Sequence, residues 1–275
     1  MKKILKNIYW ALPYKRILFN IIKKFYSPNK EIYKHLRFKE PFSTKIDEFS
    51  EFKIFNSTII ENEIFWNGFA KTWEKTSLRI WVKLAKKYKY IIDIGANTGI
   101  YSLSAAAVNS KAKIHAFEPL EIYFNILENN LKMNNFEKNI IPSQLAVGNK
   151  NSIIEIDDYS GYEKKIQVKS TTIDKYIKVN KIPKIELIKI DVEHYEPYVF
   201  EGMKETIIKF KPTILVEVLT DECANKISSF VKDLDYHFFN IDEEKGISKV
   251  DKICKSYYWN FLICRPNVSK YLGFE

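Results

Sequence analysis

The sequence predicts an α/β fold: a doubly wound, mostly parallel sheet with an antiparallel C-terminal hairpin, preceded by a basic helical N-terminal arm. Three observations predict it. Short apolar runs alternate with helical patterns from about residue 89 onward, the last two runs have no helical pattern between them, and the excess positive charge lies near the N-terminus. Strands that alternate with helices form parallel sheets covered on both faces, whereas strands joined without a helix are antiparallel.

The size and composition of the chain are those of a globular protein. It has 275 residues, of which 46% are hydrophobic, and this is enough for a sizeable core. Disordered and disulfide-scaffold classes are therefore excluded. The three cysteines, Cys223, Cys254 and Cys264, lack the close spacing of a zinc or redox motif, and an odd number makes no complete disulfide framework. This cysteine usage is typical of the reducing cytoplasm.

The net charge of +10 is confined to one segment. Residues 1–45 hold twelve of the 44 basic and two of the 34 acidic side chains, so the rest of the chain is neutral. This distribution predicts a neutral body with a basic arm rather than a nucleic-acid-binding surface. We expect the arm over residues 1–50 and a single domain over residues 51–275.

One amphipathic helix is predicted in the arm. Its apolar residues have helical spacing: Tyr14, Ile17, Leu18, Ile21, Ile22 and Phe25. Lys15, Arg16, Lys23 and Lys24 lie off this stripe, and Ser27-Pro28-Asn29 ends the helix. Two interpretations stay open: the helix packs on the body or on a second subunit, or it lies on an anionic membrane. No stretch of the arm approaches the roughly 20 apolar residues of a membrane span, and Pro13 interrupts any signal peptide.

The elements of the body follow in order. A helical stripe runs from Trp73 to Tyr88. Apolar runs predict strands at residues 89–94, 112–117, 140–147, 185–190 and 213–219, with helical patterns at 98–108, 120–134, 196–210 and 221–234. Residues 152–170 predict an inserted hairpin that turns at Tyr159-Ser160-Gly161. Two further strands, at residues 236–241 and 257–264, form the predicted antiparallel pair.

A candidate ligand site follows the first strand of this sheet. Asp93-Ile94-Gly95-Ala96-Asn97-Thr98-Gly99 leads directly into a helix. A dinucleotide fingerprint needs glycine at the first, third and sixth positions of this turn. Counted from Gly95, the third and sixth positions are Asn97 and Ile100, so two of the three fail. Asp93 would repel a pyrophosphate at the lip of the site but would suit an ammonium or sulfonium group.

The second strand ends at a further acidic residue. Glu118 lies 19 residues after Gly99, where a nucleoside-binding sheet places its acceptor for ribose hydroxyls. An acidic residue followed by Pro119 is also an ordinary start of a helix. Together with Asp93, it favours a cationic nucleoside ligand without phosphates.

These residues belong to a longer series of motifs that resembles the FkbM family of S-adenosylmethionine-dependent methyltransferases, within the Rossmann-like class. The resemblance runs from about Glu61 to Val218. It rests on Phe65-Trp66-Asn67-Gly68, Trp73-Glu74-Lys75-Thr76-Ser77, Ile92 to Ser102, Ala116-Phe117-Glu118-Pro119, Leu145-Ala146-Val147-Gly148, Thr172-Ile173-Asp174, Ile188 to Glu193, and Leu215-Val216-Glu217.

The resemblance implies S-adenosylmethionine as cofactor and methyl transfer to a hydroxyl oxygen. Its acceptor would be a saccharide of a surface glycan or a lipid-linked precursor. The implied cofactor contacts are Asp93, Gly95, Ala96, Asn97, Gly99, Tyr101, Ser102, Glu118, Pro119, Ala146, Val147 and Thr76. The implied location is the cytoplasm, with the arm either at the inner face of the membrane or on a second subunit.

The end of the fourth strand supplies the candidate catalytic residues. Asp191, Glu193 and His194 are polar groups at the sheet edge where the acceptor would lie, and a hydroxyl acceptor must lose its proton. The family commonly has glycine where this chain has His194, so that side chain is either an acceptor contact that takes the proton or a cap for the helix near Glu196. Adjacent residues rarely converge on one ion, and no metal site is predicted.

Three other functions were weighed against this one. A nucleic-acid methyltransferase is disfavoured by the acidic acceptor edge, and the Asn/Asp-Pro-Pro-aromatic motif of base methylation is absent from Asp191-Val192-Glu193-His194. Methylation of a small metabolite stays open. A non-catalytic module that only binds S-adenosylmethionine is disfavoured because Asp93, Gly95, Gly99 and Glu118 are all present.

Overall fold

The computed structural model describes residue 9, residues 13–157 and residues 165–274. Contacts within the chain separate two units, Met1–Lys75 and Thr76–Glu275. Among the helices of the described residues, none has both the length and the apolar character needed to cross a membrane.

The first unit combines short helices with a β-hairpin. Its elements are α2 (Lys15–Phe25), α3 (Lys30–Tyr33), β1 (Pro41–Lys45), β2 (Glu51–Phe55), α4 (Ile59–Asn67) and the 3-10 turn η1 (Phe69–Lys71). The helix predicted after Pro13 is present as α2. Strands β1 and β2 are antiparallel, with Pro41 opposite Phe55, so the predicted boundary at residue 50 falls inside a hairpin.

Aromatic side chains form the core of this unit. The ring of Phe19, from α2, lies 5.4 Å from Trp66 and 6.2 Å from Phe38, and Phe38 lies 4.7 Å from Phe65. These residues are all buried. Helix α4 begins with a capping box, in which the Thr58 hydroxyl accepts from the backbone of the first turn and the Glu61 carboxylate accepts from the Thr58 amide. Burial of the large rings holds α2 against α4.

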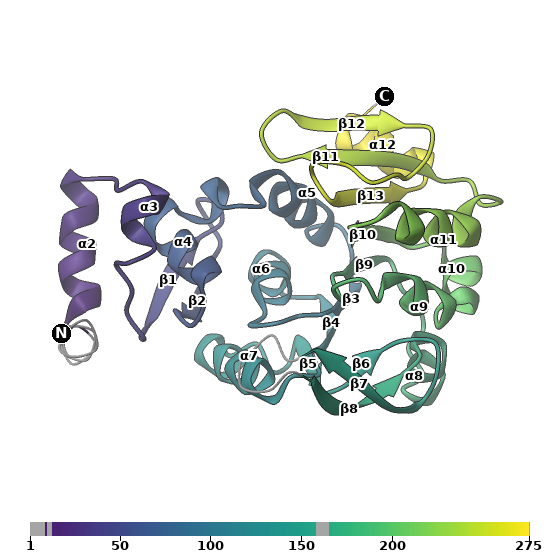
Figure 1. The fold of residues 1–275 in the computed structure, drawn as a ribbon, viewed down its shortest axis with the longest axis horizontal. Coiled ribbons are helices and arrows are strands. Elements are labelled where there is room, and N and C mark those ends of the chain that lie inside the picture. Colours follow the sequence, from purple (N-terminus) through teal and green to yellow (C-terminus); the bar gives the residue numbers. More distant parts are fainter. Residues whose placement is uncertain (1–8, 10–12, 158–164, 275) are drawn as a thin grey trace. The chain divides into compact units, whose positions relative to one another are not determined.

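The second unit is built on one large sheet, drawn in Figure 1. Its strand order is β12-β11-β13-β10-β9-β3-β4-β5. The strands β5, β4, β3, β9 and β10 are parallel, and β13, β11 and β12 are antiparallel to their neighbours. Their bounds are β3 (Tyr90–Ile94), β4 (Lys113–Phe117), β5 (Ile140–Ser143), β9 (Leu187–Ile190), β10 (Thr213–Glu217), β11 (His237–Asp242), β12 (Gly246–Val250) and β13 (Asn260–Cys264).

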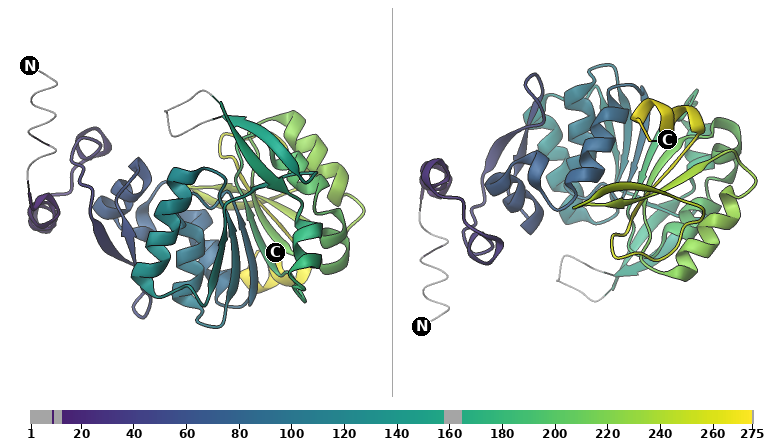
Figure 2. Two further views of the ribbon diagram at one scale, coloured as in Figure 1. Left: turned by 90° about the horizontal axis from the view of Figure 1, so that it is seen from below. Right: turned by 90° about the horizontal axis from the view of Figure 1, so that it is seen from above.

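Helices cover both faces of this sheet, as the two views of Figure 2 show. They are α5 (Lys75–Ala85), α6 (Ile100–Val108), α7 (Glu121–Asn134), α8 (Ile173–Val179), α9 (Glu196–Glu201), α10 (Lys204–Phe210), α11 (Asp221–Val231) and α12 (Pro266–Leu272). Alternate strand residues such as Ile92, Ile94, Ile188 and Ile190 share one apolar core with α8 to α11. The intervening residues of β3 and β9 therefore point to the opposite face, toward α6. The predicted doubly wound, mostly parallel sheet is confirmed.

Several element boundaries differ from the prediction. The run at residues 140–147 is two strands, because the amide of Leu145 bonds to Ser143 O and turns the chain. Strand β6 (Ala146–Val147) pairs instead with the hairpin of β7 (Ser152–Asp157) and β8 (Lys165–Thr171). The turn predicted at residues 159–161 lies outside the described residues.

Two further differences concern helices and the C-terminal strands. The pattern at residues 196–210 is broken into α9 and α10 at Gly202, where a Cβ would stand 1.9 Å from Gly148 O. The strands predicted at residues 236–241 and 257–264 are antiparallel neighbours, as expected. They are not joined by a simple turn, because β12 lies between them in sequence and β13 inserts between β10 and β11.

Candidate active site

The site lies where the strand order reverses. Strands β3 and β9 are adjacent, β4 and β5 lie on one side of them, and β10 lies on the other. Loops that leave such a switch point diverge and open a ligand crevice at the carboxyl ends of the strands. The turn after β3 and the segment after β9, which begins at Asp191, both lie at this edge.

The amide groups of the turn after β3 are satisfied within the protein. Gly95 and Ala96 both donate to Phe117 O at 2.9 Å, and Gly99 donates to Ala96 O at 2.8 Å. Asn97 donates to a Glu118 carboxylate oxygen, and Thr98 donates to the Asn97 side chain, each at 2.8 Å. A pyrophosphate is normally held by free amides of such a turn. These five are already used, which favours a ligand without phosphates.

The two glycines of the turn are needed for close packing. Gly95 has φ +80°, and a Cβ on it would stand 1.8 Å from the carbonyl oxygen of Asp191. Gly99 has φ +98°, and a Cβ there would meet Leu127 of α7 at 2.5 Å. Glycine thus lets the turn approach both β9 and α7. The cofactor contact predicted for these residues stays a prediction.

Glu118 locks the turn to the end of β4. One carboxylate oxygen accepts from Asn97 N and the other from Leu120 N, both at 2.8 Å. The side chain is only 4% exposed, and burial raises the pKa of this carboxyl to about 7. A carboxylate offers about four acceptor positions. Two acceptor positions of the Glu118 carboxylate remain for the hydroxyls of a ribose. This residue therefore fits a nucleoside ligand.

Asp93 corrects one expectation. Its carboxylate is 1% exposed rather than open at the lip, and it accepts a hydrogen bond of 2.6 Å from the Ser102 hydroxyl of α6. Burial raises the pKa of Asp93 to about 6, against the opposing effects of Ser102 and Lys189. Asp93 therefore holds α6 to β3 from beneath the turn.

A buried lysine lies between the acidic residues. Lys189 is opposite Asp93 in the register of β3 and β9, and it is 1% exposed. Its ammonium lies 3.3 Å from an Asp191 carboxylate oxygen and 5.1 Å from the centre of the Tyr101 ring. An unpaired charge at this depth would be very costly, so Lys189 needs the acidic residues around it. It fixes Asp191, the residue that follows β9.

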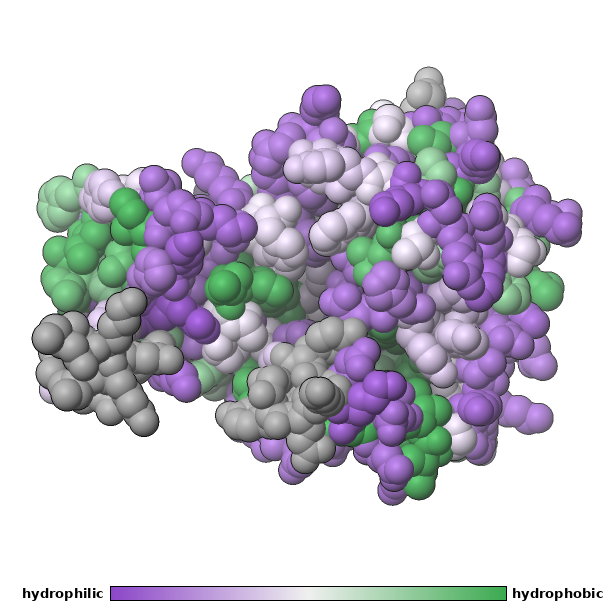
Figure 3. Space-filling view, viewed as in Figure 1, coloured by the Kyte–Doolittle hydropathy of each residue, from purple (hydrophilic) through white to green (hydrophobic). Residues whose placement is uncertain are grey.

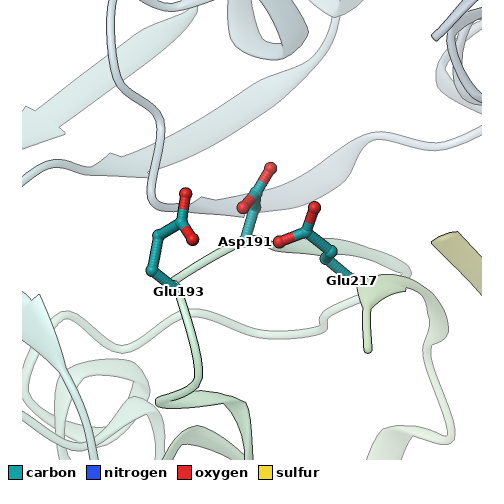
Figure 4. Close-up of side chains that lie close together, drawn as sticks. All are labelled: Asp191, Glu193 and Glu217. Carbon is teal, nitrogen blue, oxygen red and sulfur yellow. The ribbon is translucent and has the colours of Figure 1, made fainter. Parts of the chain in front are cut away.

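Three carboxylates meet above this lysine. Oxygens of Asp191, Glu193 and Glu217 all lie within 4.8 Å of one another, and Figure 4 shows the three side chains turned toward a common point. Val216 pairs with Ile190 in the register of β10 and β9, which places Glu217 beside Asp191. Burial and the neighbouring Asp191 raise the pKa of Glu193. We call these three residues the acidic cluster.

The backbone next to this cluster is strained. Glu193 and His194 have φ values of +50° and +76°, and each non-glycine residue in this region costs about 1–2 kcal/mol. Glycine adopts a φ near +76° freely. This explains why the FkbM family, which the sequence resembles, commonly has glycine at the position of His194. The alternative in which His194 caps the next helix is wrong. Tyr195 is the N-cap of α9 and makes no side-chain cap, whereas the buried Glu196 accepts from Val192 N at 3.1 Å.

Other predicted cofactor residues lie at different places. Thr76, in α5, gives its amide and hydroxyl to Glu243 at 2.6 and 3.2 Å. Ala146 and Val147 lie in β6, and Pro119 follows Glu118 ahead of α7. Their contact with a cofactor stays a prediction, as does the acceptor contact of His194.

Sequence reasoning missed Lys189 and Glu217 as site residues. Lysine within the otherwise apolar run 187–190 was a signal of a buried charge. Glu217 ends β10, next to the strand that ends at Asp191. The rule that ligands bind at carboxyl strand ends could have found it.

The fold and the site define a class of protein. A doubly wound sheet whose switch point carries the buried carboxylate of Glu118, beside a turn whose amides from Gly95 to Gly99 are used, has the features of a domain for a nucleoside ligand without phosphates. Residues 93–238, more than half of the chain, match the family model described as Methyltransferase FkbM domain. The chain belongs to the FkbM methyltransferase family, and S-adenosylmethionine is its cofactor.

Similar folds occur among solved structures. The methyltransferase FkbM of Methylobacillus flagellatus KT is 19% identical, with a TM-score of 0.45; the match covers 64% of this chain and 43% of that one. The chain thus spans less than half of that relative. The precorrin-6y C5,15-methyltransferase of Geobacter metallireducens GS-15 is 16% identical, with a TM-score of 0.40 and coverages of 70% and 86%.

An O-methyltransferase of Bacillus cereus, solved in complex with SAH, is 14% identical, with a TM-score of 0.41; the match covers 68% of this chain and 78% of that one. Among curated protein sequences, none matches this chain.

Proposed function

We propose that this protein transfers the methyl group of S-adenosylmethionine to a hydroxyl oxygen of a saccharide. The observation that carries the proposal is the acidic cluster of Asp191, Glu193 and Glu217, at the switch point beside the Gly95–Gly99 turn. The cofactor, when bound, supplies a sulfonium methyl group that is open to displacement. The chain's own residues must then orient the acceptor and take its proton.

The acidic cluster suits the removal of a proton from a hydroxyl. Glu193 has its pKa raised by burial and by Asp191, and a carboxylate with a raised pKa is a stronger base than an ordinary one. Asp191 is held by Lys189 and so keeps a fixed direction. We assign Asp191 to positioning and to charge, and Glu193 to the proton, with His194 as a neighbour that contacts the acceptor.

The charge of this edge favours a neutral acceptor. Around one buried lysine lie the carboxylates of Asp93, Asp191, Glu193 and Glu217. This excess of negative charge disfavours the phosphates of a nucleic acid. A sugar offers several neutral hydroxyls that carboxylates accept hydrogen bonds from, which supports a saccharide.

The test measures transfer of a labelled methyl group from S-adenosylmethionine to glycans isolated from cells that lack the gene. Wild-type protein should label the glycans, and mass spectrometry should find the mass of one added CH2 group on a sugar. Glu193→Gln, which removes the proposed proton acceptor, should lower kcat by about 10²–10⁴-fold, and Asp191→Asn should lower kcat as well. The exposed Asp233→Asn serves as the control and should be unaffected. Label in RNA or protein rather than glycan, or full turnover in Asp191→Asn, would contradict the proposal.

Three carboxylates also have the donor chemistry of a divalent cation site, so the proton-acceptor role needs its own test. Treatment with EDTA followed by gel filtration should leave the methyl transfer unchanged. Loss of activity that Mg²⁺ restores would show instead that Asp191, Glu193 and Glu217 act as ligands.

A further inference from the structure

Helix α2 packs on its own unit with the face opposite to its apolar stripe. Phe19 enters the aromatic core, and Lys15 donates to Tyr9 O at 3.0 Å. Arg16 bonds to Pro41 O, and Lys23 bonds to Phe65 O and lies over the Phe65 ring. Arg16 and Lys23, two of the four basic residues that lie off the stripe, thus hold the helix to β1 and α4.

The apolar stripe of α2 is consequently exposed. Ile22 is partly buried, and the other five members lie half or more open to solvent: Tyr14, Ile17, Leu18, Ile21 and Phe25. They follow the spacing of one helix face. Figure 3 shows apolar surface, in green, over the part of the first unit where Figure 1 labels α2. Soluble surfaces rarely leave such a stripe uncovered, and a contiguous patch of this kind marks an interaction site.

A basic pocket lies along one edge of this stripe. It has a volume of about 460 Å³ and is formed by α2, β1 and the end of α4. Its polar lining consists of Arg16, Asn20, Lys23, Ser43, Thr44 and Lys45. Ile17 lines the pocket too and belongs to the stripe, so the two features are continuous.

The pocket has the chemistry of an anion site. Three of its lining residues are cations, and Glu40, which lies 3.5 Å from Arg16, is not among the lining residues. Burial lowers the pKa of Lys23, and an anion beside this ammonium would offset the cost of its desolvation. The exposed Ser43, which also lines the pocket, carries a hydroxyl that can donate to a phosphate oxygen.

We infer that α2 is an interfacial anchor whose apolar stripe enters an anionic phospholipid surface while the pocket beside it receives a lipid phosphate. The charge of the arm favours an anionic membrane over a second copy of the chain. The segment of residues 1–45 holds the entire net charge of +10, so two such segments repel each other, whereas anionic headgroups attract them. A stripe flanked by Tyr14 and Phe25 also has aromatic rings where they favour the membrane interface.

The test is co-sedimentation of the full chain with vesicles of phosphatidylcholine, alone or mixed equally with phosphatidylglycerol. Wild-type protein should sediment with the mixed vesicles only, and salt should release it. Leu18→Gln combined with Ile21→Gln, on the exposed stripe, should weaken the apparent affinity at least about tenfold, as should Lys45→Glu in the pocket. Matched controls on the second unit are Ile208→Gln and Lys178→Glu, both exposed, and they should bind as wild type.

Three results would overturn the inference. One is failure of the intact protein to bind mixed vesicles, or equal binding to vesicles of phosphatidylcholine alone. Another is a dimer in sedimentation velocity that Leu18→Gln with Ile21→Gln converts to monomer, which would assign the stripe to a second copy. The last is a rise in melting temperature with inorganic phosphate that Lys45→Glu abolishes while vesicle binding stays intact, which would make the pocket a site for a soluble anion.

Discussion

Glu118 gives the cofactor site a pH dependence that calorimetry can measure. Burial raises the pKa of this carboxyl to about 7, and the ribose hydroxyls of the cofactor require its ionised form as acceptor. Protonation therefore competes with the ligand as the pH falls through about 7. The ionised fraction rises from about one tenth at about pH 6 to about nine tenths at about pH 8. Affinity should rise about tenfold, which corresponds to about 1.4 kcal/mol.

The assay is titration of the purified protein with S-adenosylhomocysteine at both pH values. Glu118→Gln should weaken binding at about pH 8 by about 1.5–3 kcal/mol, the worth of a hydrogen bond to a charged group. It should also remove most of the tenfold change with pH. Glu121→Gln, an exposed acid of the first turn of α7, should retain both the affinity and its pH dependence.

Two results would refute the reasoning. Equal affinity at about pH 6 and about pH 8 in the wild type would mean that the carboxyl of Glu118 does not titrate in the site. If the Glu118→Gln variant kept the full pH dependence of the affinity, another titrating group would be its cause. Asp93, with a pKa of about 6, would be the first to examine, and Asp93→Asn would identify it.

Three further predictions concern stability and turnover. Gly95→Ala should lower the free energy of unfolding, measured by urea titration, by more than about 3 kcal/mol, because its Cβ would overlap Asp191 O. Gly273→Ala, in the left-handed region with φ +83° and open space, should cost only about 1 kcal/mol. Lys189→Met should destabilise by about 3 kcal/mol at neutral pH by leaving buried carboxylates unpaired. That loss should shrink below about pH 6 as Asp93 is protonated; a pH-independent loss would contradict the charge argument. His194→Gly should raise the free energy of unfolding by about 1 kcal/mol by releasing a φ of +76°. It should change KM for the acceptor more than kcat, whereas loss of one limb of the pH–rate profile would make His194 the base.

Patterns local in the sequence predicted the architecture of the second unit. Apolar runs and helical stripes located β3, β4, β9, β10, α6, α7 and α11. Their alternation fixed a parallel sheet, because each strand must be covered on both faces. The break between β5 and β6 and the break at Gly202 were not predictable in this way. Strand β6 is defined by its pairing with β8, and the break at Gly202 depends on the close approach of the distant Gly148 O.

The first unit was the least predictable part. Strands β1 and β2 have five residues each, and their buried apolar residues are only Phe42, Phe52 and Ile54, so the alternation is too short to predict a hairpin. The outward direction of the α2 stripe could not be inferred, because an amphipathic pattern normally predicts an apolar face turned inward. Here Phe19 and the hydrogen bonds of Arg16 and Lys23 hold the opposite face.

The candidate site was predicted where its residues follow a strand. Asp191, Glu193 and Glu118 were found by the rule for strand ends, and the structure brings Asp191 and Glu193 together. The same rule does not reveal burial. Asp93 was expected at an open lip because the sequence does not show that the Ser102 hydroxyl of α6 donates a hydrogen bond to it. The role of Lys189 in the site was not predicted, because a strand pattern does not show which neighbouring side chains pair with a buried charge.

A crystal structure of the protein with S-adenosylhomocysteine tests the assignment of the cofactor site most directly. We predict that the ribose hydroxyls lie within hydrogen-bond distance of the Glu118 carboxylate, and that the sulfur faces Asp191 across the switch point of β3 and β9. A ribose bound away from Glu118, or a sulfur turned away from the acidic cluster, would contradict it.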